Sequence, residues 1–215
     1  MKSTTYKTPG LCLLIGCFLM FITMVMHPTG GDIDHILKIW VIAVASHAIA
    51  IASIPFLAVG FWGMERRLQE ADFLSKLSFA IIITGLVAVM IAAAINGLAY
   101  PIYATMYEGA SEATLASIEP VTRFGFALNH AMDYIFMGAV CASTILWSLA
   151  IYRTKSLPMW LGHLGLLLSI AALVTWILGF VFVDLHGFRV FIFGWVIWVL
   201  LAGFLLLKAK QDEAA

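Results

Sequence analysis

Long, nearly uninterrupted runs of apolar residues restrict the folds open to this chain more than any other feature. A helix needs about 20 apolar residues, at ~1.5 Å of rise each, to cross the ~30 Å of hydrocarbon in a bilayer. Six segments meet or approach that length: residues 11–26, 36–64, 77–107, 121–152, 156–183 and 187–207. The sequence therefore predicts an all-α integral membrane protein, a bundle of six transmembrane helices forming a single polytopic domain over residues 1–215.

The composition excludes several other classes of protein. Hydrophobic residues make up 63% of the chain and charged residues 11%, against roughly 45–50% and about 25% in soluble domains. A net charge of +0 offers no basic surface to a phosphate backbone, so we expect no nucleic-acid partner. The three cysteines lie in apolar runs without a CxxC pair, which argues against a disulfide scaffold.

Two prolines predict irregularities near the ends of these segments. Pro101 lies near the end of the third segment, where a proline is expected to kink a helix. Residues 108–120 separate the third and fourth segments, and we expect them to form a short surface helix that stops at Pro120.

Lysine and arginine are divided unevenly between the two sides of the predicted bundle. Nine lie on the side of the N-terminus and three on the other side, the latter being Lys38, Arg123 and Arg189. Because cytoplasmic loops carry the excess of basic residues, both termini are predicted to be cytoplasmic. We expect a multi-pass protein of a bacterial inner membrane.

Polar residues of three predicted helices fall at one depth. At ~1.5 Å per residue, His130 and Asp133 lie ~13–18 Å below the outer surface, His47 ~12–16 Å and Asn96 ~13 Å. Asp133 is the one acidic residue placed within the hydrocarbon, a costly position unless the bundle interior stabilises it. The sequence thus predicts a polar, outward-facing pocket between helices.

Further side chains are expected around this layer. Residues seven apart share a helix face, so Arg123 is predicted to lie above His130, with Tyr134 one turn below it. We expect the other polar residues near the outer surface to be ordinary exposed loop residues without an assigned role, namely His27, His35, His186 and Asp184.

A b-type haem is the cofactor that this pattern favours most. His47 and His130, at equal depth on two helices, would supply both axial ligands, and Arg123 would meet a propionate. Such a protein would bind a haem in the outer leaflet and transfer electrons to a redox partner.

Two other functions use the same residues. His47, His130 and Asp133 could bind zinc or iron in a membrane enzyme, with Asp133, Asn96 or Tyr134 acting on a small, lipid-like hydrophobic substrate. Alternatively, Asp133 and His130 could be the protonatable pair of a proton-coupled small-molecule transporter. No phosphate-binding loop, nucleophile elbow or HExxH motif decides between these functions.

The predicted topology can be checked by cysteine labelling. In a chain with its three native cysteines replaced by alanine, Glu112→Cys should react with a membrane-impermeant maleimide added to the outer side. Labelling from the cytoplasmic side alone would contradict the topology.

Overall fold

Helices form nearly all of the structure, a computed structural model that describes residues 6–209. The long helices are α1 (Lys7–Met26), α2 (Ile33–Arg67), α3 (Phe73–Ala94), α5 (Glu112–Thr154), α6 (Met159–Ile177) and α7 (Leu185–Lys208). A 3-10 turn (Gln69–Ala71), a π turn (Ile95–Ala99) and the short α4 (Tyr100–Thr105) complete the described range. Six helical units within it are long and apolar enough to cross a membrane, α3, the π turn and α4 forming one of them. The predicted all-α, multi-pass membrane protein is confirmed, whereas the side that each end faces stays a prediction.

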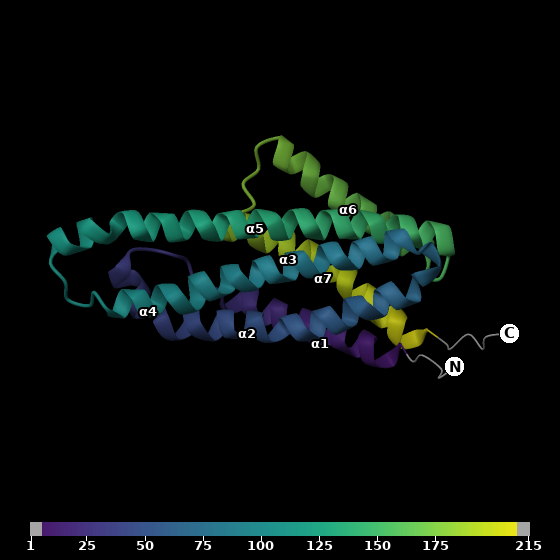
Figure 1. The fold of residues 1–215 in the computed structure, drawn as a ribbon, viewed down its shortest axis with the longest axis horizontal. Helices are drawn as coiled ribbons and strands as arrows, with labels where there is room; N and C mark the ends of the chain where they lie inside the picture. Colours follow the sequence, from purple (N-terminus) through teal and green to yellow (C-terminus); the bar gives the residue numbers. More distant parts are fainter. Residues whose placement is uncertain (1–5, 210–215) are drawn as a thin grey trace.

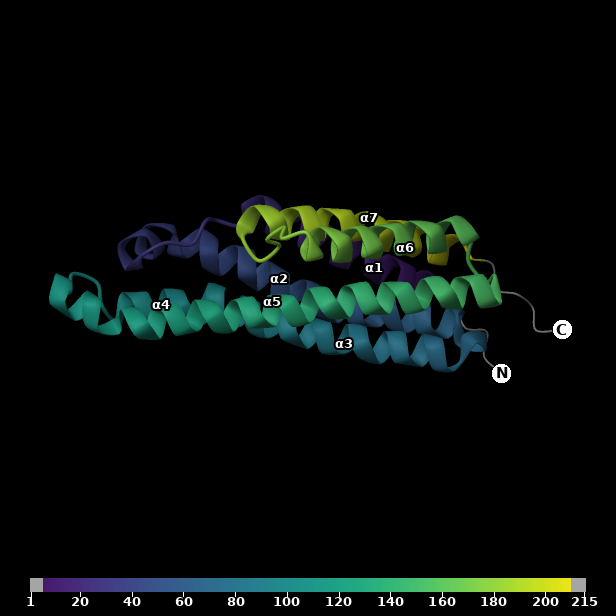
Figure 2. The ribbon, with the colours of Figure 1, turned by 90° about the horizontal axis from the view of Figure 1, so that it is seen from above.

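The helices differ greatly in length, and this gives the bundle two unlike ends. With 35 and 43 residues, α2 and α5 are far longer than α1 and α6, which have 20 and 19. In Figures 1 and 2, α4 and the first turns of α2 and α5 extend past α1, α6 and α7. We call this the distal end, and the opposite end, where α1 begins and α7 finishes, the terminal end.

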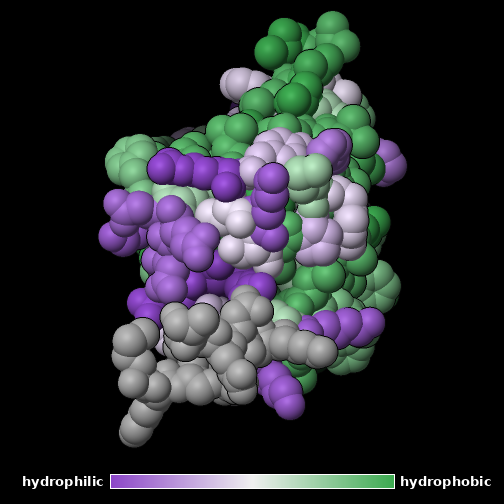
Figure 3. Space-filling view, turned by 90° about the vertical axis from the view of Figure 1, so that its right-hand side faces the viewer, coloured by the Kyte–Doolittle hydropathy of each residue, from purple (hydrophilic) through white to green (hydrophobic). Residues whose placement is uncertain are grey.

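The terminal end is polar, while the flanks of the bundle are apolar. Figure 3 looks onto this end and shows hydrophilic side chains gathered across it, with hydrophobic side chains around the sides and over α6. The charged residues exposed here include Arg66, Glu70, Asp72, Arg153 and Lys155. Such an end face is suited to water and lipid headgroups.

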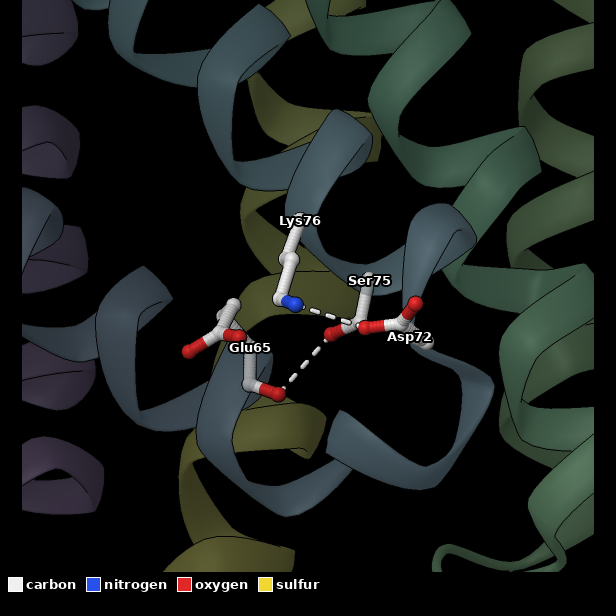
Figure 4. A network of polar contacts seen from close by, with 4 residues as sticks. All are labelled: Glu65, Asp72, Ser75 and Lys76. Carbon is white, nitrogen blue, oxygen red and sulfur yellow. Dashed lines mark hydrogen bonds and ion pairs between the residues drawn. The ribbon is translucent and has the colours of Figure 1, made fainter.

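A tight connection between α2 and α3 lies at this end (Figure 4). The Ser75 hydroxyl donates to the Glu65 carbonyl oxygen at 2.8 Å, closing the turn across ten residues. The Lys76 ammonium lies 2.6 Å from the Asp72 carboxylate, and both side chains are exposed. An exposed pair of this kind contributes little to stability, because solvent screens the two charges.

The expected helix stop at Pro120 was wrong, because α5 is continuous from Glu112 and begins nine residues before the predicted 121. Ser111 caps its first turn by accepting a hydrogen bond from the Thr114 backbone N–H at 3.3 Å. Ile118 is buried in a small apolar cluster with Ile33 of α2 and Tyr100 of α4. Packing before the proline therefore outweighs the hydrogen bond that the proline removes.

The fifth predicted segment, 156–183, was too long, since α6 spans Met159–Ile177. Gly179 has a φ of +91°, a conformation that favours glycine. The Phe180 N–H donates to the Thr175 carbonyl and the Gly179 N–H to the Trp176 carbonyl, both at 3.0 Å, which is a Schellman motif. Apolar residues continue past this stop, but the helix does not.

A π turn lies immediately before Pro101, near which a kink is expected. The Tyr100 N–H bonds to the Ile95 carbonyl, five residues back, so the helix widens immediately before the proline. Pro101 has no N–H to donate to the Gly97 carbonyl, and the wider turn accommodates this missing hydrogen bond. Such turns often mark functional positions, and this one carries Asn96.

Glycines bring α1 and α2 into close contact. A Cβ on Gly60 would overlap Leu13, and a Cβ on Gly63 would overlap the ring of Pro9. Helices in lipid associate through such packing because no hydrophobic force draws them together. A cluster of larger side chains that includes Phe61, Trp147 and Trp198 then fills the interior.

We predict that Gly63→Ala destabilises the bundle by about 1–3 kcal/mol through overpacking against Pro9. Gly138→Ala is the matched control, since no atom beyond the surrounding backbone of α5 lies within 4 Å of its Cβ position and α5 should gain up to about 1 kcal/mol. Thermal unfolding in detergent measures both. Equal midpoints for the two variants would contradict the assigned contact.

Candidate functional site

A polar cavity of about 200 Å³ lies between α1, α2, the end of α3, α5 and the segment leading into α7. Four of the residues predicted from depth line it, namely His47, Asn96, His130 and Asp133. His47 and Asp133 are buried, Asn96 is half-buried and His130 is exposed. The cavity therefore reaches from the bundle interior to the surface.

His47 is held in a fixed orientation by its own helix. Its Nδ1–H donates to the Ala43 carbonyl oxygen at 2.7 Å, which leaves Nε2 with a lone pair and no partner among residues 6–209. Gly97 of the π turn lies directly against this side chain, where a Cβ would overlap the imidazole. The histidine therefore has little freedom to rotate away.

His27 lies beside His47, an association that the sequence did not predict. The two ring centroids are 4.6 Å apart with the rings tilted by 57°. The Nδ1–H of His27 donates to the Pro28 carbonyl oxygen at 2.9 Å, which again leaves Nε2 free. Burial, followed by the nearby His47, lowers the pKa of His27 to about 4, so this imidazole is neutral at physiological pH.

Arg189 of α7 fixes the segment that carries His27. Its Nε donates to the Met24 carbonyl oxygen at 3.1 Å and its Nη2 to the His27 carbonyl oxygen at 2.8 Å. These are carbonyls at the C-terminal end of α1, where a cation also opposes the negative end of the helix dipole. Arg189 thus positions His27 without itself lining the cavity.

Asp133 has one hydrogen-bond partner in the described chain. The Asn129 side-chain amide donates to Asp133 Oδ2 at 2.8 Å, and both residues are 7% exposed. No lysine, arginine or histidine forms an ion pair with it between residues 6 and 209. A carboxylate buried without a cation is costly, which makes Asp133 a candidate for ligand binding.

The lining of the cavity favours a positively charged ligand. Asp184, which caps α7 through a 2.6 Å bond from the Gly187 N–H, adds a second carboxylate. No lysine or arginine lines the cavity within the described residues. Two thioethers, from Met20 and Met24, also line it.

Arg123 does not line this cavity, although it lies on the same face of α5 as His130. It forms an exposed ion pair with Glu119 at 2.7 Å and lines a separate distal cavity. The ring of Phe126 separates the two spaces, lining both and packing 5.0 Å from the Tyr100 ring. Arg123 and His130 share a helix face, but the Phe126–Tyr100 pair lies between Arg123 and the polar cavity.

Tyr134 also lies away from the cavity. It is 43% exposed and packs against Trp176 of α6, with 6.3 Å between ring centroids. His163 bonds to the Met159 carbonyl and Tyr152 hydroxyl, His35 lies against the Thr29 carbonyl, and His186 is exposed. None of these three histidines lines the cavity.

The sequence did not predict the position of His27 because the depth estimate started every helix at one surface. His47 lies 14 residues along α2, or ~21 Å from its first residue. α1 ends beside this point, and residues 27–32 continue to the distal end before α2 begins. The apolar runs do not reveal that the helices differ in length. This difference places His27, which was expected at the surface, next to His47, which was expected inside the bundle.

The described residues contain no group of three or more His, Cys, Asp or Glu side chains arranged to hold a metal ion. His27 and His47 come together as a pair, while His130, Asp133 and Asp184 lie elsewhere on the lining. Comparison with protein-family models, curated proteins and solved structures finds no match. The site must therefore be interpreted from its own chemistry.

We predict that Asp133→Asn leaves the ligand-free fold intact and raises its stability by about 1–2 kcal/mol, because the amide replaces a buried acid that has no cationic partner. Asp72→Asn, at an exposed ion pair, should leave stability nearly unchanged. Chemical denaturation in detergent compares the two. A loss of more than about 1 kcal/mol in Asp133→Asn would mean that the carboxylate has a structural role.

Proposed function

We propose that the protein binds a divalent transition-metal ion, zinc or iron, in the polar cavity, with His27 and His47 as protein ligands. The observation that carries this proposal is the pair of imidazoles, 4.6 Å between ring centroids, each with an unpartnered Nε2. Neutral imidazole is a preferred ligand of both metals, with Zn–N bonds of about 2.0–2.1 Å. Rings this close can share one ion when both Nε2 atoms face it.

The charge of the cavity supports a cation. Asp133 and Asp184 bring two carboxyl groups to the lining, and the lining residues described here include no basic side chain other than histidine. Because two imidazoles make an incomplete set of ligands, water or a substrate would occupy the remaining positions. His130 and Asp133 would act on groups bound there, which keeps both within the proposed site.

Haem b is the second candidate, and one observation favours it. His47 and His130 come from two helices and line the same cavity, as a pair of axial ligands must. The volume of about 200 Å³, however, lies below the ~300–1,000 Å³ typical of small-molecule and cofactor sites. A single ion fits this space better, and Arg123, the expected partner of a propionate, lies beyond Phe126.

Elemental analysis combined with an absorption spectrum tests the proposal. The protein purified in detergent and supplied with zinc or iron should hold about one ion per chain and show no Soret band. His27→Ala and His47→Ala should each lower metal affinity by at least ~10-fold. His163→Ala, a histidine bonded to Tyr152 outside the cavity, is the control and should bind metal as the wild type does.

Two results would overturn the proposal. One is a wild-type protein that takes up neither metal. If that metal-free protein carries out proton-coupled solute uptake and Asp133→Asn does not, the result would favour the transporter interpretation. The other is a Soret band that is lost in His47→Ala and His130→Ala but kept in His27→Ala, which would assign the site to haem.

A further inference from the structure

Met20 and Met24 of α1 line the polar cavity, and the proposed metal site gives these two thioethers no role. They are 4% and 3% exposed, so both side chains face the inside of the bundle rather than lipid. Residues four and seven apart share a helix face. Met24 and His27 therefore continue the face that begins at Met20, and one side of α1 brings two thioethers and an imidazole to the cavity.

The packing of α1 against α2 places Met24 beside His47. The Thr23 hydroxyl donates to the Ser46 carbonyl oxygen of α2 at 3.3 Å. Four residues further along the chain, the His27 ring lies 4.6 Å from the His47 ring, measured between centroids. Met24 lies between these two contacts, so its backbone is held close to the imidazole pair.

The methionines form the floor of the cavity, below the imidazoles. Met24 lies 17 residues from the first residue of α1 and Ala50 17 residues from the last residue of α2, each ~25 Å from the terminal end. Ala50 lines the cavity with a single methyl group, so α2 leaves room at this level for a longer side chain. His27 and His47 are three residues nearer the distal end, which separates the two levels by only ~5 Å. The unbranched methionine side chain, with three rotatable bonds, can adapt to a ligand across this distance.

The donors on this side of the cavity suit a soft cation of low charge. Two imidazole nitrogens and two thioether sulfurs are all uncharged. Thioether sulfur selects Cu(I), whereas Zn²⁺ takes imidazole, carboxylate and thiolate ligands. Methionine supplies half of this set, so it is distinct from the groups of His, Cys, Asp and Glu that are missing among the described residues.

The floor of the cavity also favours a singly charged ion. Val89 and Ala92 of α3 line it beside the methionines, and neither offers a polar side chain. An apolar shell limits the access of water to a metal and sets the dielectric around it. Because burial of charge becomes more costly as the charge rises, such a floor favours the cuprous over the cupric ion.

We propose that the polar cavity binds a cuprous ion between the imidazole pair and the thioethers of Met20 and Met24. The inference rests on the proposed function for its His27 and His47 ligands, and goes beyond it in the ion and in the two sulfur ligands. It concerns binding alone, since the ion enters and stays as Cu(I).

Titration of the full chain in detergent tests this site. Cu(I) is added without oxygen in competition with the chelator bicinchoninate, and zinc is titrated in parallel. Met20→Leu and Met24→Leu each remove a thioether and nearly keep its volume. Each should weaken Cu(I) binding by at least ~10-fold, the loss typical of even an outer-shell partner of a metal, and leave zinc affinity unchanged. His27→Ala should weaken the binding of both ions.

Met64→Leu is the matched control variant. Met64 is fully buried near the terminal end of α2 and does not line the polar cavity. This variant should bind Cu(I) and zinc as the wild type does, and thermal unfolding should show all three methionine variants folded. X-ray absorption at the copper edge should show sulfur neighbours in the wild type and in Met64→Leu, and fewer of them in Met24→Leu.

The outcomes separate this inference from the proposed function. Uptake of zinc or iron without uptake of Cu(I) overturns the inference alone. Uptake of Cu(I) with neither of the other metals supports it and overturns the choice of zinc or iron. Cu(I) affinity that is unchanged in both Met20→Leu and Met24→Leu, as it would be for copper held by cysteine, overturns the inference. Equal weakening in Met64→Leu does the same, because the methionines would then serve only in packing.

Discussion

Close packing of backbones at glycine is the constraint on which the rest of this bundle depends. Water drives apolar helices together in soluble proteins, but lipid gives them no such preference. Here Gly60 and Gly63 admit Leu13 and Pro9 of α1, while Gly165 lets α6 approach α5. At Gly97 the same device brings the π turn against His47, so the packing that holds the helices together also fixes a side chain of the polar cavity.

The polar cavity depends on the unequal lengths of α1 and α2. Were α1 and α2 equally long, their connection would lie at the surface and His27 would be solvated there. Because α2 continues past α1, the end of α1 is enclosed by other helices, and its last carbonyls need a donor other than water. Arg189 supplies that donor. The enclosed helix end, its arginine and the imidazole pair therefore form one unit.

Much of the architecture and part of the site could be predicted from the sequence. The length of the apolar runs is sufficient for six crossings, and counting rise per residue brought His47, Asn96, His130 and Asp133 to one layer. Helix ends were less predictable, because the Schellman motif at Gly179 and the packing of Ile118 depend on bonds and neighbours that hydropathy does not record. Arg123 and Tyr134 were expected at the site from their helix faces. The Phe126–Tyr100 pair separates Arg123 from the polar cavity, and Tyr134 packs against α6 instead. Both contacts are tertiary and cannot be predicted from a helix face.

The π turn has a consequence for how this helix tolerates insertion and deletion. Each residue of an α-helix advances by about 100° around the axis, so one additional residue in a turn rotates everything after it by that angle. Before the turn, Ala92 and Ala93 face the polar cavity, and after it Tyr100 and Ala104 face the apolar cluster at the distal end. Deleting one residue between 95 and 99 would restore regular geometry and bring the two halves out of phase with their neighbours. The irregular turn therefore allows one continuous span to contact both the polar cavity and the distal apolar cluster, which lie on different sides of the helix.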